Sequence, residues 1–100
     1  MNAIRVQLPY HLRTLAKVTD DVMLTVGDAP TIGSLLDALE AAYPPLQGTI
    51  REHVSQKRRP WIRFFACRED ISFQPYDHPL PPAVVKGEEP FMVVGAIAGG

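Results

Sequence analysis

The chain has 100 residues, of which 46% are apolar and 21% charged, a balance typical of one compact globular domain and not of a disordered or fibrous protein. The formal net charge of −1 argues against a nucleic-acid-binding surface, and the single cysteine, Cys67, excludes an internal disulfide. The first residues lack the apolar segment of a signal peptide, and no apolar stretch approaches the roughly twenty residues that span a bilayer. We therefore expect a cytoplasmic protein with neither nucleic acid nor a membrane among its partners.

Two short alternating segments open the chain. Apolar and polar residues alternate over residues 3 to 8, which predicts a half-buried strand that ends at Pro9. A polar connection follows, in which Leu12 and Leu15 are expected to tuck back onto the core. The alternation returns over residues 22 to 26 and predicts a second strand, paired with the first as a hairpin.

The firmest local prediction is a helix that begins after Thr31, a good N-cap residue. Apolar residues from Ile32 to Tyr43 fall at helical spacing, and Pro44 ends the pattern because proline lacks the amide hydrogen and clashes with the preceding turn. A second, short helix is expected around Leu46, Ile50 and Val54.

The second half of the chain predicts two more strands. The segment Trp61–Cys67 is rich in aromatic and β-branched residues and has the length of a strand. Four prolines between Ser72 and Pro82 predict an irregular loop with at most a short edge strand. A turn in which Gly87 supplies positive φ then leads into a final strand over Phe91–Ile97.

The element order ββαββ buries most apolar area if the helix packs across one face of a mixed sheet, which is a two-layer α+β arrangement. A right-handed crossover through the helix would place a later strand parallel to the first. The last strand is then expected to lie in the centre of the sheet.

The chain closes with Gly99-Gly100 directly after the expected final strand. Two residues without a Cβ atom allow a close approach by a partner's backbone, so this tail can thread a narrow active site. From Ile97 the extended chain reaches roughly 13 Å at about 3.3 Å per residue. We expect residues 1–97 to form a single domain and residues 98–100 a flexible tail, although small residues are also common at frayed ends.

This element order, with its terminal Gly-Gly, resembles the β-grasp, ubiquitin-like sulfur carriers of the MoaD/ThiS type. Further segments look like the same family, so the resemblance covers nearly the whole chain: they are Ile4-Arg5-Val6, the helix from Thr31 to Pro44, Glu69-Asp70-Ile71 and Lys86-Gly87-Glu88-Glu89. The resemblance implies a β-grasp fold, a mixed four- to five-stranded sheet with one main helix packed across one face. The run from Arg59 to Ile71 looks most like the branch that serves cysteine-type sulfur transfer.

Some positions depart from the family pattern. Cys67-Arg68 stands where the family commonly has an Asn-Gly-like turn, and Gly95 stands where it has a proline in the final strand. The stretch Pro75–Pro82 is also unusually rich in proline. Neither of the first two changes affects the terminal carboxylate, whereas the proline-rich stretch bears on the strand pairing of that region and on the choice of partner.

A terminal carboxylate has a pKa of about 3.3 to 3.7, so at neutral pH it is an anion that must be activated before it can react as an acyl group. In this family an ATP-dependent, E1-like enzyme adenylates the terminal glycine, and a persulfide donor then supplies sulfur to give a thiocarboxylate. The resemblance implies that Gly100 carries the sulfur to a sulfur-acceptor synthase, while Ile97, Ala98 and Gly99 contact these partners. It also implies that the chain is a co-substrate and not an enzyme, and that it binds no cofactor, the ATP being used by the activating enzyme.

Other candidate sites have weaker support. Cys67 with His11, His53 or His78 would make a thiol nucleophile and base, but no spacing supports the pairing, and a small structural cysteine is the commoner case. The same scattered residues have no paired ligand spacing, so no metal site is expected.

A basic cluster and a set of aromatic residues also need an explanation. Lys57-Arg58-Arg59, close to Arg51 and Arg63, would suit an acidic partner or a phosphate, but a solvated loop is the commoner explanation. The large aromatic residues are expected to belong mainly to the core. They are Trp61, Phe64, Phe65 and Phe91.

Two other functions remain open besides the sulfur carrier. A ubiquitin-like modifier would use the same adenylation but pass its acyl group from Gly100 to a lysine amine. A noncovalent β-grasp binding module would make no covalent use of the glycine tail. The acceptor of a carried sulfur, whether of molybdopterin, thiamin or cysteine type, is not specified by these residues.

Overall fold

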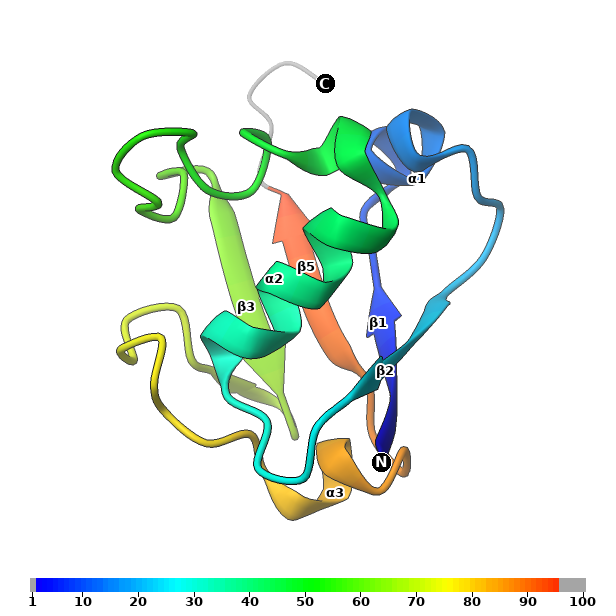
Figure 1. Cartoon of the computed structure of the whole chain (residues 1–100), viewed down its shortest axis with the longest axis vertical. Helices are drawn as coiled ribbons and strands as arrows, with labels where there is room; N and C mark the ends of the chain where they lie inside the picture. The colour runs from blue at the N-terminus through cyan, green and yellow to red at the C-terminus, as the bar shows by residue number, and fades with distance from the viewer. Residues whose placement is uncertain (1, 96–100) are drawn as a thin grey trace.

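A computed structural model describes residues 2–95, which form a five-stranded mixed sheet with one long helix across one face (Figure 1). The elements in chain order are β1 (Asn2–Gln7), α1 (Tyr10–Ala16), β2 (Val22–Val26), α2 (Ile32–Ala42), the 3-10 helix η1 (Pro44–Leu46), β3 (Ile62–Ala66), β4 (Glu69–Asp70), α3 (Pro82–Val85) and β5 (Phe91–Gly95). The sheet order is β2-β1-β5-β3-β4. Strands β1 and β5 run parallel, and the other neighbouring pairs are antiparallel. The last strand is therefore central and parallel to the first, as predicted.

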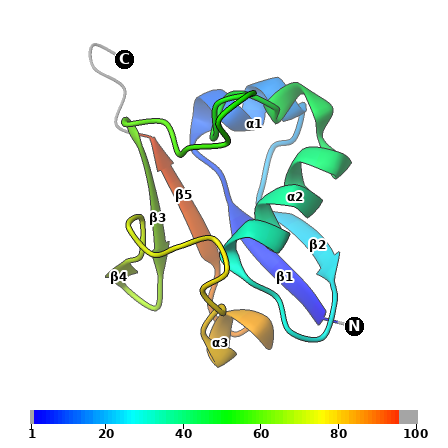
Figure 2. The same cartoon turned by 60° about the vertical axis from the view of Figure 1, so that its left-hand side comes forward.

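The core lies between α2 and the inner face of the sheet (Figure 2). The fully buried side chains of the strands and of α2 meet there: Ile4, Val6, Ile32, Leu35, Leu36, Leu39, Ile62, Phe64 and Phe91. Burying each such side chain contributes about 1.5–3 kcal/mol, so this layer supplies much of the folding free energy.

The aromatic residues divide between the core and the surface. The rings of Phe64 and Phe91 are buried with their centroids 5.5 Å apart, as predicted for core residues. Phe65 is only half-buried, because it points to the other face of β3. Trp61 is 46% exposed beside the guanidinium of Arg59, so its prediction as a core residue was wrong.

Helix α2 begins where predicted and has a capping box at its first turn. The Thr31 hydroxyl accepts from the backbone N–H of Ser34, and the Ser34 hydroxyl accepts from the backbone N–H of Thr31. The next two N–H groups donate to carbonyls of the proline-rich loop, Ile32 to His78 at 3.1 Å and Gly33 to Tyr76 at 2.8 Å. The loop over residues 71–81 is irregular, as predicted, and it satisfies donors that a helix start otherwise leaves unpaired.

The connection between the first two strands contains helix α1, where the sequence predicted only a polar segment. Pro9 precedes the helix, and Lys17 ends it in the left-handed conformation with φ of 61°. Leu12 is buried, as predicted, but Leu15 is 45% exposed. A helix of seven residues with one buried side chain has almost no hydrophobic periodicity, so its sequence pattern is weak.

The second helix predicted around residues 46–54 is not formed. Only η1 continues the chain after α2, and residues 47–61 form turns and one isolated bridge, between Arg51 and Arg58. Leu46 and Ile50 are buried as expected of apolar residues, but Val54 is 97% exposed. The prediction took three apolar residues at helical spacing for a helix, although Gly48 lies between them with φ of +82°.

A buried ion pair anchors residues 47–61 to α2. The Arg51 side chain is 5% exposed, and it donates from Nε to Glu40 Oε2 and from Nη2 to Asp37 Oδ1, both at 2.9 Å. Burial alone would lower the pKa of Arg51, but its hydrogen bonds to Glu40 and Asp37 and their negative charges outweigh burial, so the pKa is raised. Arg51 is therefore charged at neutral pH.

Within residues 2–95, no helix is both long enough and apolar enough to cross a membrane. The end of the predicted domain at residue 97 and the predicted tail over residues 98–100 lie outside the described residues, so the division between them stays a prediction.

Candidate functional site

The predicted reactive tail follows β5, the central strand. Its residues Ile97, Ala98, Gly99 and Gly100 lie outside the described residues, which end at Gly95. The surfaces on either side of the end of β5 are therefore the described parts of the chain nearest in sequence to the tail.

The face of the sheet opposite α2 carries apolar side chains where β3 and β5 pair. Because side chains alternate along a strand, the residues between the buried ones point away from the core. Arg63 pairs with Val94 and Phe65 pairs with Met92 in the antiparallel register of β3 and β5. Val94 is 36% exposed, while Phe65 and Met92 are half-buried, so these side chains form an accessible apolar surface.

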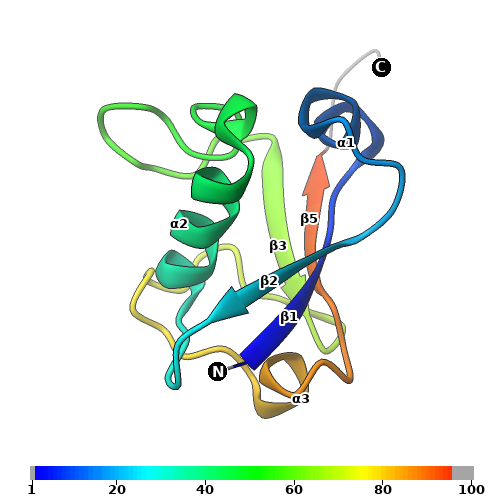
Figure 3. The same ribbon diagram turned by 45° about the vertical axis from the view of Figure 1, so that its right-hand side comes forward.

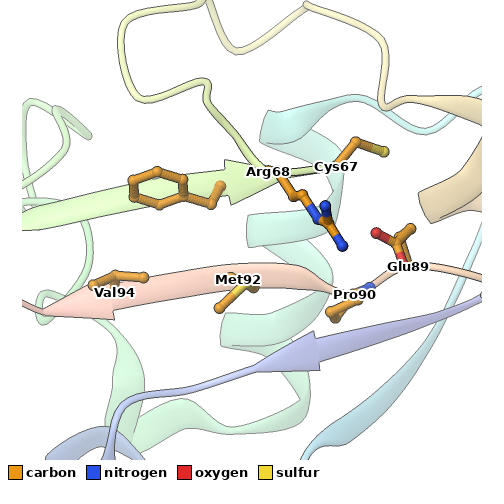
Figure 4. A pocket seen from close by; sticks show the side chains of 7 residues that line it. Cys67, Arg68, Glu89, Pro90, Met92 and Val94 are labelled. Atoms are coloured by element: carbon orange, nitrogen blue, oxygen red, sulfur yellow. The ribbon is translucent and has the colours of Figure 1, made fainter.

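A pocket of about 480 Å³ lies on this face (Figure 4). Phe65, Met92 and Val94 line it from the two strands, and Pro90 extends its apolar wall. Its other lining residues are Cys67, Arg68 and Glu89, and Figure 4 shows the Arg68 side chain extending toward Glu89 and Pro90. The pocket combines an apolar floor with a polar edge, which is the composition of a protein docking site.

Cys67 and Arg68 form the tight turn between β3 and β4. Both have positive φ, 52° and 68° respectively, which is the backbone of the primed hairpin turns that favour Asn-Gly. The turn has this shape without the usual Asn-Gly pair, at the cost of placing two residues other than glycine or asparagine in the left-handed region. Cys67 is exposed in this turn, so the prediction that it behaves as a small hydrophobic structural cysteine was wrong as to its hydrophobic environment.

Helix α1 packs beside the end of β5 (Figure 3). A Cβ atom at Gly95 would lie 2.7 Å from Cε1 of His11, so the absence of a side chain at Gly95 leaves room for the imidazole. A second pocket of about 480 Å³ runs along the same end of β5, and Arg13, Asp20 and Asp21 give it a polar wall. The strand that leads to the tail is thus flanked by an apolar pocket on one side and a polar pocket on the other.

A short hydrogen-bond network closes the far edge of the sheet at β4. Asp70 Oδ1 accepts from the Ser72 hydroxyl at 2.5 Å and from the Ser72 backbone N–H at 2.9 Å. The hydroxyl oxygen of Ser72 in turn accepts from the backbone N–H of Phe64. The hydrogen bonds from Ser72, with smaller contributions from the charges of Arg63 and Arg58, lower the pKa of Asp70. The carboxylate is therefore ionised at neutral pH and holds the edge strand in place.

The basic cluster is not the solvated loop that the sequence predicted, except at Lys57, which is exposed. Arg58 Nη1 donates to the carbonyls of Ile62 and Arg59, and Arg58 Nε donates to the carbonyl of Ser72. Arg59 donates from Nε and Nη2 to the carbonyl of Gly48 at 3.0 and 2.8 Å. Both guanidiniums are half-buried and hold main-chain segments together.

His11 and His53 do not form a catalytic pair with Cys67. His11 packs against Gly95, whereas Cys67 follows Ala66, which pairs with Phe91 at the opposite end of β5. His53 packs over Gly48 in another loop. Across residues 2–95 there is no group of three or more His, Cys, Asp or Glu side chains placed to hold a metal ion.

No protein-family model matches the chain, and no curated protein matches its sequence. Solved structures do match. SAMP1, a small archaeal modifier protein, from Haloferax volcanii is 19% identical with a TM-score of 0.77, covering 98% of this chain and 99% of that chain. The chain has the β-grasp fold. A chain of the Amycolatopsis orientalis BexX/CysO complex is 20% identical with a TM-score of 0.74, covering 98% of this chain and all of that chain. CysO from Mycobacterium tuberculosis is 19% identical with a TM-score of 0.70, covering 93% and 98%.

These likenesses confirm the predicted β-grasp, ubiquitin-like fold and agree with the resemblance to MoaD/ThiS-type carriers. At identities this low they show the fold alone. In this arrangement β5 lies in the centre of the sheet, and both pockets border this strand.

Sequence reasoning missed the outer apolar face. The signal was present in the final strand, where the apolar residues Met92 and Val94 alternate with the buried residues Phe91 and Val93. A strand that is apolar on both faces is either covered on both sides or exposes an apolar surface, and the position of α2 on one side only leaves the second possibility.

Proposed function

We propose that the chain is a sulfur carrier whose Gly100 carboxylate is adenylated by an E1-like enzyme and converted to a thiocarboxylate. The sulfur then passes to an acceptor synthase in cofactor or amino-acid biosynthesis, of the molybdopterin, thiamin or cysteine type. In this proposal the chain acts in the cytoplasm as a co-substrate, with ATP bound by the activating enzyme and no cofactor bound by the carrier itself.

The observation that carries this proposal is the position of the apolar pocket beside β5. An activating enzyme has to hold the carrier firmly while the tail enters its active site. Phe65, Met92 and Val94 provide a surface for that contact. Of these, Val94 lies six residues before Gly100 in the sequence. Extended chain covers roughly 3.3 Å per residue, so this distance in sequence is enough to reach from the docking face into an active site.

The carboxylate anion is a poor acyl electrophile, so it has to be activated before sulfur can attack it. Attack of the Gly100 carboxylate on the α-phosphate of ATP forms the acyl adenylate and releases pyrophosphate. A persulfide sulfur then attacks the acyl carbon and AMP leaves. Attack of a thiol on the resulting acyl disulfide releases the thiocarboxylate and forms an ordinary disulfide, which balances the electrons. Attachment to a protein holds the nucleophilic sulfur for delivery to one acceptor.

A ubiquitin-like modifier is the second candidate, and the similarity to small archaeal modifier protein 1 favours it. The two functions share the adenylation of Gly100 and differ in the nucleophile that follows. Sulfur gives a thiocarboxylate, while a lysine amine of a target protein gives an isopeptide bond.

Recovery of the protein from its host separates the two candidates. We expect intact wild-type protein to show a mass gain equal to exchanging one oxygen for sulfur, and few conjugates by denaturing gel. A ladder of isopeptide-linked conjugates without the mass gain would assign the modifier function instead. Absence of both would favour a noncovalent β-grasp binding module.

The docking face has its own test in a matched pair of variants. Met92→Glu places a charge in the apolar pocket, and Met23→Glu places the same charge on β2, where the side chain is 58% exposed and lies two strands away from β5. We expect Met92→Glu to reduce thiocarboxylate formation strongly and Met23→Glu to leave it near the wild-type level. Equal effects of the two variants would contradict docking at the pocket.

A further inference from the structure

A third hollow, separate from both pockets beside β5, is a groove between two loops next to β3. Its volume is about 430 Å³, and it is lined by residues 55–58 from one loop and residues 72–76 from the other. Figure 1 shows these loops, in green and yellow, beside β3 on the side away from β1. We call this surface the basic groove.

The lining of the basic groove contains cations and neutral polar groups but no carboxylate. Lys57 and Arg58 supply positive charge, while Ser55, Gln74 and Tyr76 supply hydroxyl or amide groups. Among the described residues, neither Lys57 nor Arg58 has a carboxylate within ion-pair distance. The lining of the groove therefore carries two positive charges and no negative charge, even though the chain as a whole has a net charge of −1.

Arg58 is held in one position by the backbone, which leaves part of its guanidinium available. Its Nε and Nη1 atoms donate to three carbonyls at 2.6 to 3.2 Å. Its Nη2 atom makes no hydrogen bond with any residue in the described part of the chain. A fixed guanidinium with free N–H groups loses little conformational entropy when it binds an anion.

The groove also presents an exposed aromatic ring. Phe73 is 78% exposed, and the guanidinium carbons of Arg58 and Arg63 each lie 5.0 Å from its ring centroid. An exposed ring held beside two arginines has the composition of binding hot spots in protein interfaces, which are enriched in aromatic residues and arginine.

The carboxylates close to the groove are already engaged. Asp70 accepts from Ser72, lies 3.5 Å from Arg63 and also interacts with the charge of Arg58. Glu52 accepts from Ser55 and lies 3.9 Å from Arg59. Asp77, next to Tyr76, is exposed but does not line the groove.

We infer that the basic groove binds an acidic segment of a partner protein, whose carboxylates meet Lys57 and Arg58 while its chain packs on Phe73. Charge complementarity favours a carboxylate-bearing peptide. A nucleic-acid strand is a poorer fit, because two lining cations in a chain of net negative charge provide little of the phosphate neutralisation on which such binding depends. This surface is separate from the pocket beside Met92 and does not depend on the chemistry of Gly100.

The test is a titration of the isotope-labelled full chain with a six-glutamate peptide, in which binding is monitored by the amide chemical shifts in NMR spectra. We expect the shift changes to concentrate on residues 55–58 and 72–76 and to weaken at high salt. Lys57→Gln should weaken binding about two- to fivefold, the size expected for losing one exposed ion pair. Phe73→Ala should also weaken binding measurably, because the peptide loses the apolar ring surface on which its chain packs. A six-glutamine peptide should cause no such changes.

Tyr10→Ala is the matched control, since Tyr10 is a 76% exposed aromatic residue beside Arg13, outside the groove. We expect it to bind the peptide like the wild type. Shift changes spread over the surface, or unaltered affinity in both groove variants, would overturn the inference. Tighter binding of inorganic phosphate or of an eight-nucleotide thymidine strand at the same amides would also overturn it, in favour of a phosphate site.

Discussion

Replacing Arg51 with methionine removes a guanidinium from a buried ion pair while keeping most of the apolar stem of the side chain. Glu40 is then left 12% exposed without its partner, whereas Asp37 is 73% exposed and can be solvated. Breaking a buried pair by removing one partner costs about 3–5 kcal/mol, and an exposed pair contributes only about 0.2–1 kcal/mol. We expect Arg51→Met to lower the free energy of unfolding by about 3 kcal/mol, nearly all of it through Glu40.

Urea unfolding followed by circular dichroism measures this change. With a slope of about 1–3 kcal/mol per molar urea for a small domain, the midpoint should fall by about 1 M or more. Asp37→Asn should change the free energy of unfolding by less than about 1 kcal/mol. The double variant Glu40→Met with Arg51→Met should recover much of the loss, because an apolar pair can replace a buried ion pair without leaving a charge unpaired.

The reasoning would be refuted if Arg51→Met cost less than about 1 kcal/mol, or if the double variant were no more stable than Arg51→Met alone. The first result would mean that Glu40 finds water or another partner. The second would mean that the loss came from packing and not from an unpaired carboxylate. Because Arg51 also lies against the Tyr76 ring, 5.6 Å from its centroid, we expect Arg51→Met to broaden the amide signals of the basic groove.

Three further predictions concern the turns and the first helix. Because the pKa of Asp70 is lowered in the folded state, its ionisation contributes stability that is present above about pH 4 and is lost as the pH falls through the folded-state pKa. Asp70→Asn should therefore flatten the acid side of a profile of unfolding free energy against pH. An unchanged profile would show that the hydrogen bonds from Ser72 do not cause the loss of stability in acid. Gly48→Ala should lower the free energy of unfolding, followed as a drop in the thermal midpoint, by about 1–2 kcal/mol, because alanine is strained at the φ of +82° that Gly48 adopts. An unchanged midpoint would show that alanine adopts this conformation without strain. Leu12→Ala should lower the free energy of unfolding in urea by about 2–5 kcal/mol, and Leu15→Ala should lower it by less than about 1 kcal/mol. Similar losses for the two variants would mean that both leucines are buried.

Much of the fold could be predicted from local patterns in the sequence. The alternation in β1 and β2, the capped helix α2 and the aromatic segment of β3 each have a strong local signal, and the parallel pairing of β1 with β5 follows from crossover geometry. Elements whose existence depends on tertiary contacts were harder to predict. Helix α1 buries only Leu12, and the apparent helical spacing of Leu46, Ile50 and Val54 is interrupted by the turn at Gly48.

The surfaces could be predicted only in part. The alternation in β5 reveals its two apolar faces, but the exposure of Met92 and Val94 depends on which side α2 covers. In the sequence, the arginines of the basic cluster look like part of a solvated loop. Their hydrogen bonds to the carbonyls of Gly48, Ile62 and Ser72 could not be predicted, because they join residues up to fourteen positions apart. Long side chains that hydrogen-bond the backbone leave no periodic pattern in the sequence.

The central claim is that Gly100 carries sulfur as a thiocarboxylate, and the intact mass of the protein tests it most directly. The protein would be incubated with an extract of its host cells, ATP and a cysteine-derived sulfur source, beside a control without ATP and a Gly100→Ala variant. We predict an ATP-dependent mass gain equal to exchanging one oxygen for sulfur, located in the peptide that contains Gly99 and Gly100 and absent from the variant. No mass gain in an extract that thiocarboxylates a known carrier would contradict the proposed function.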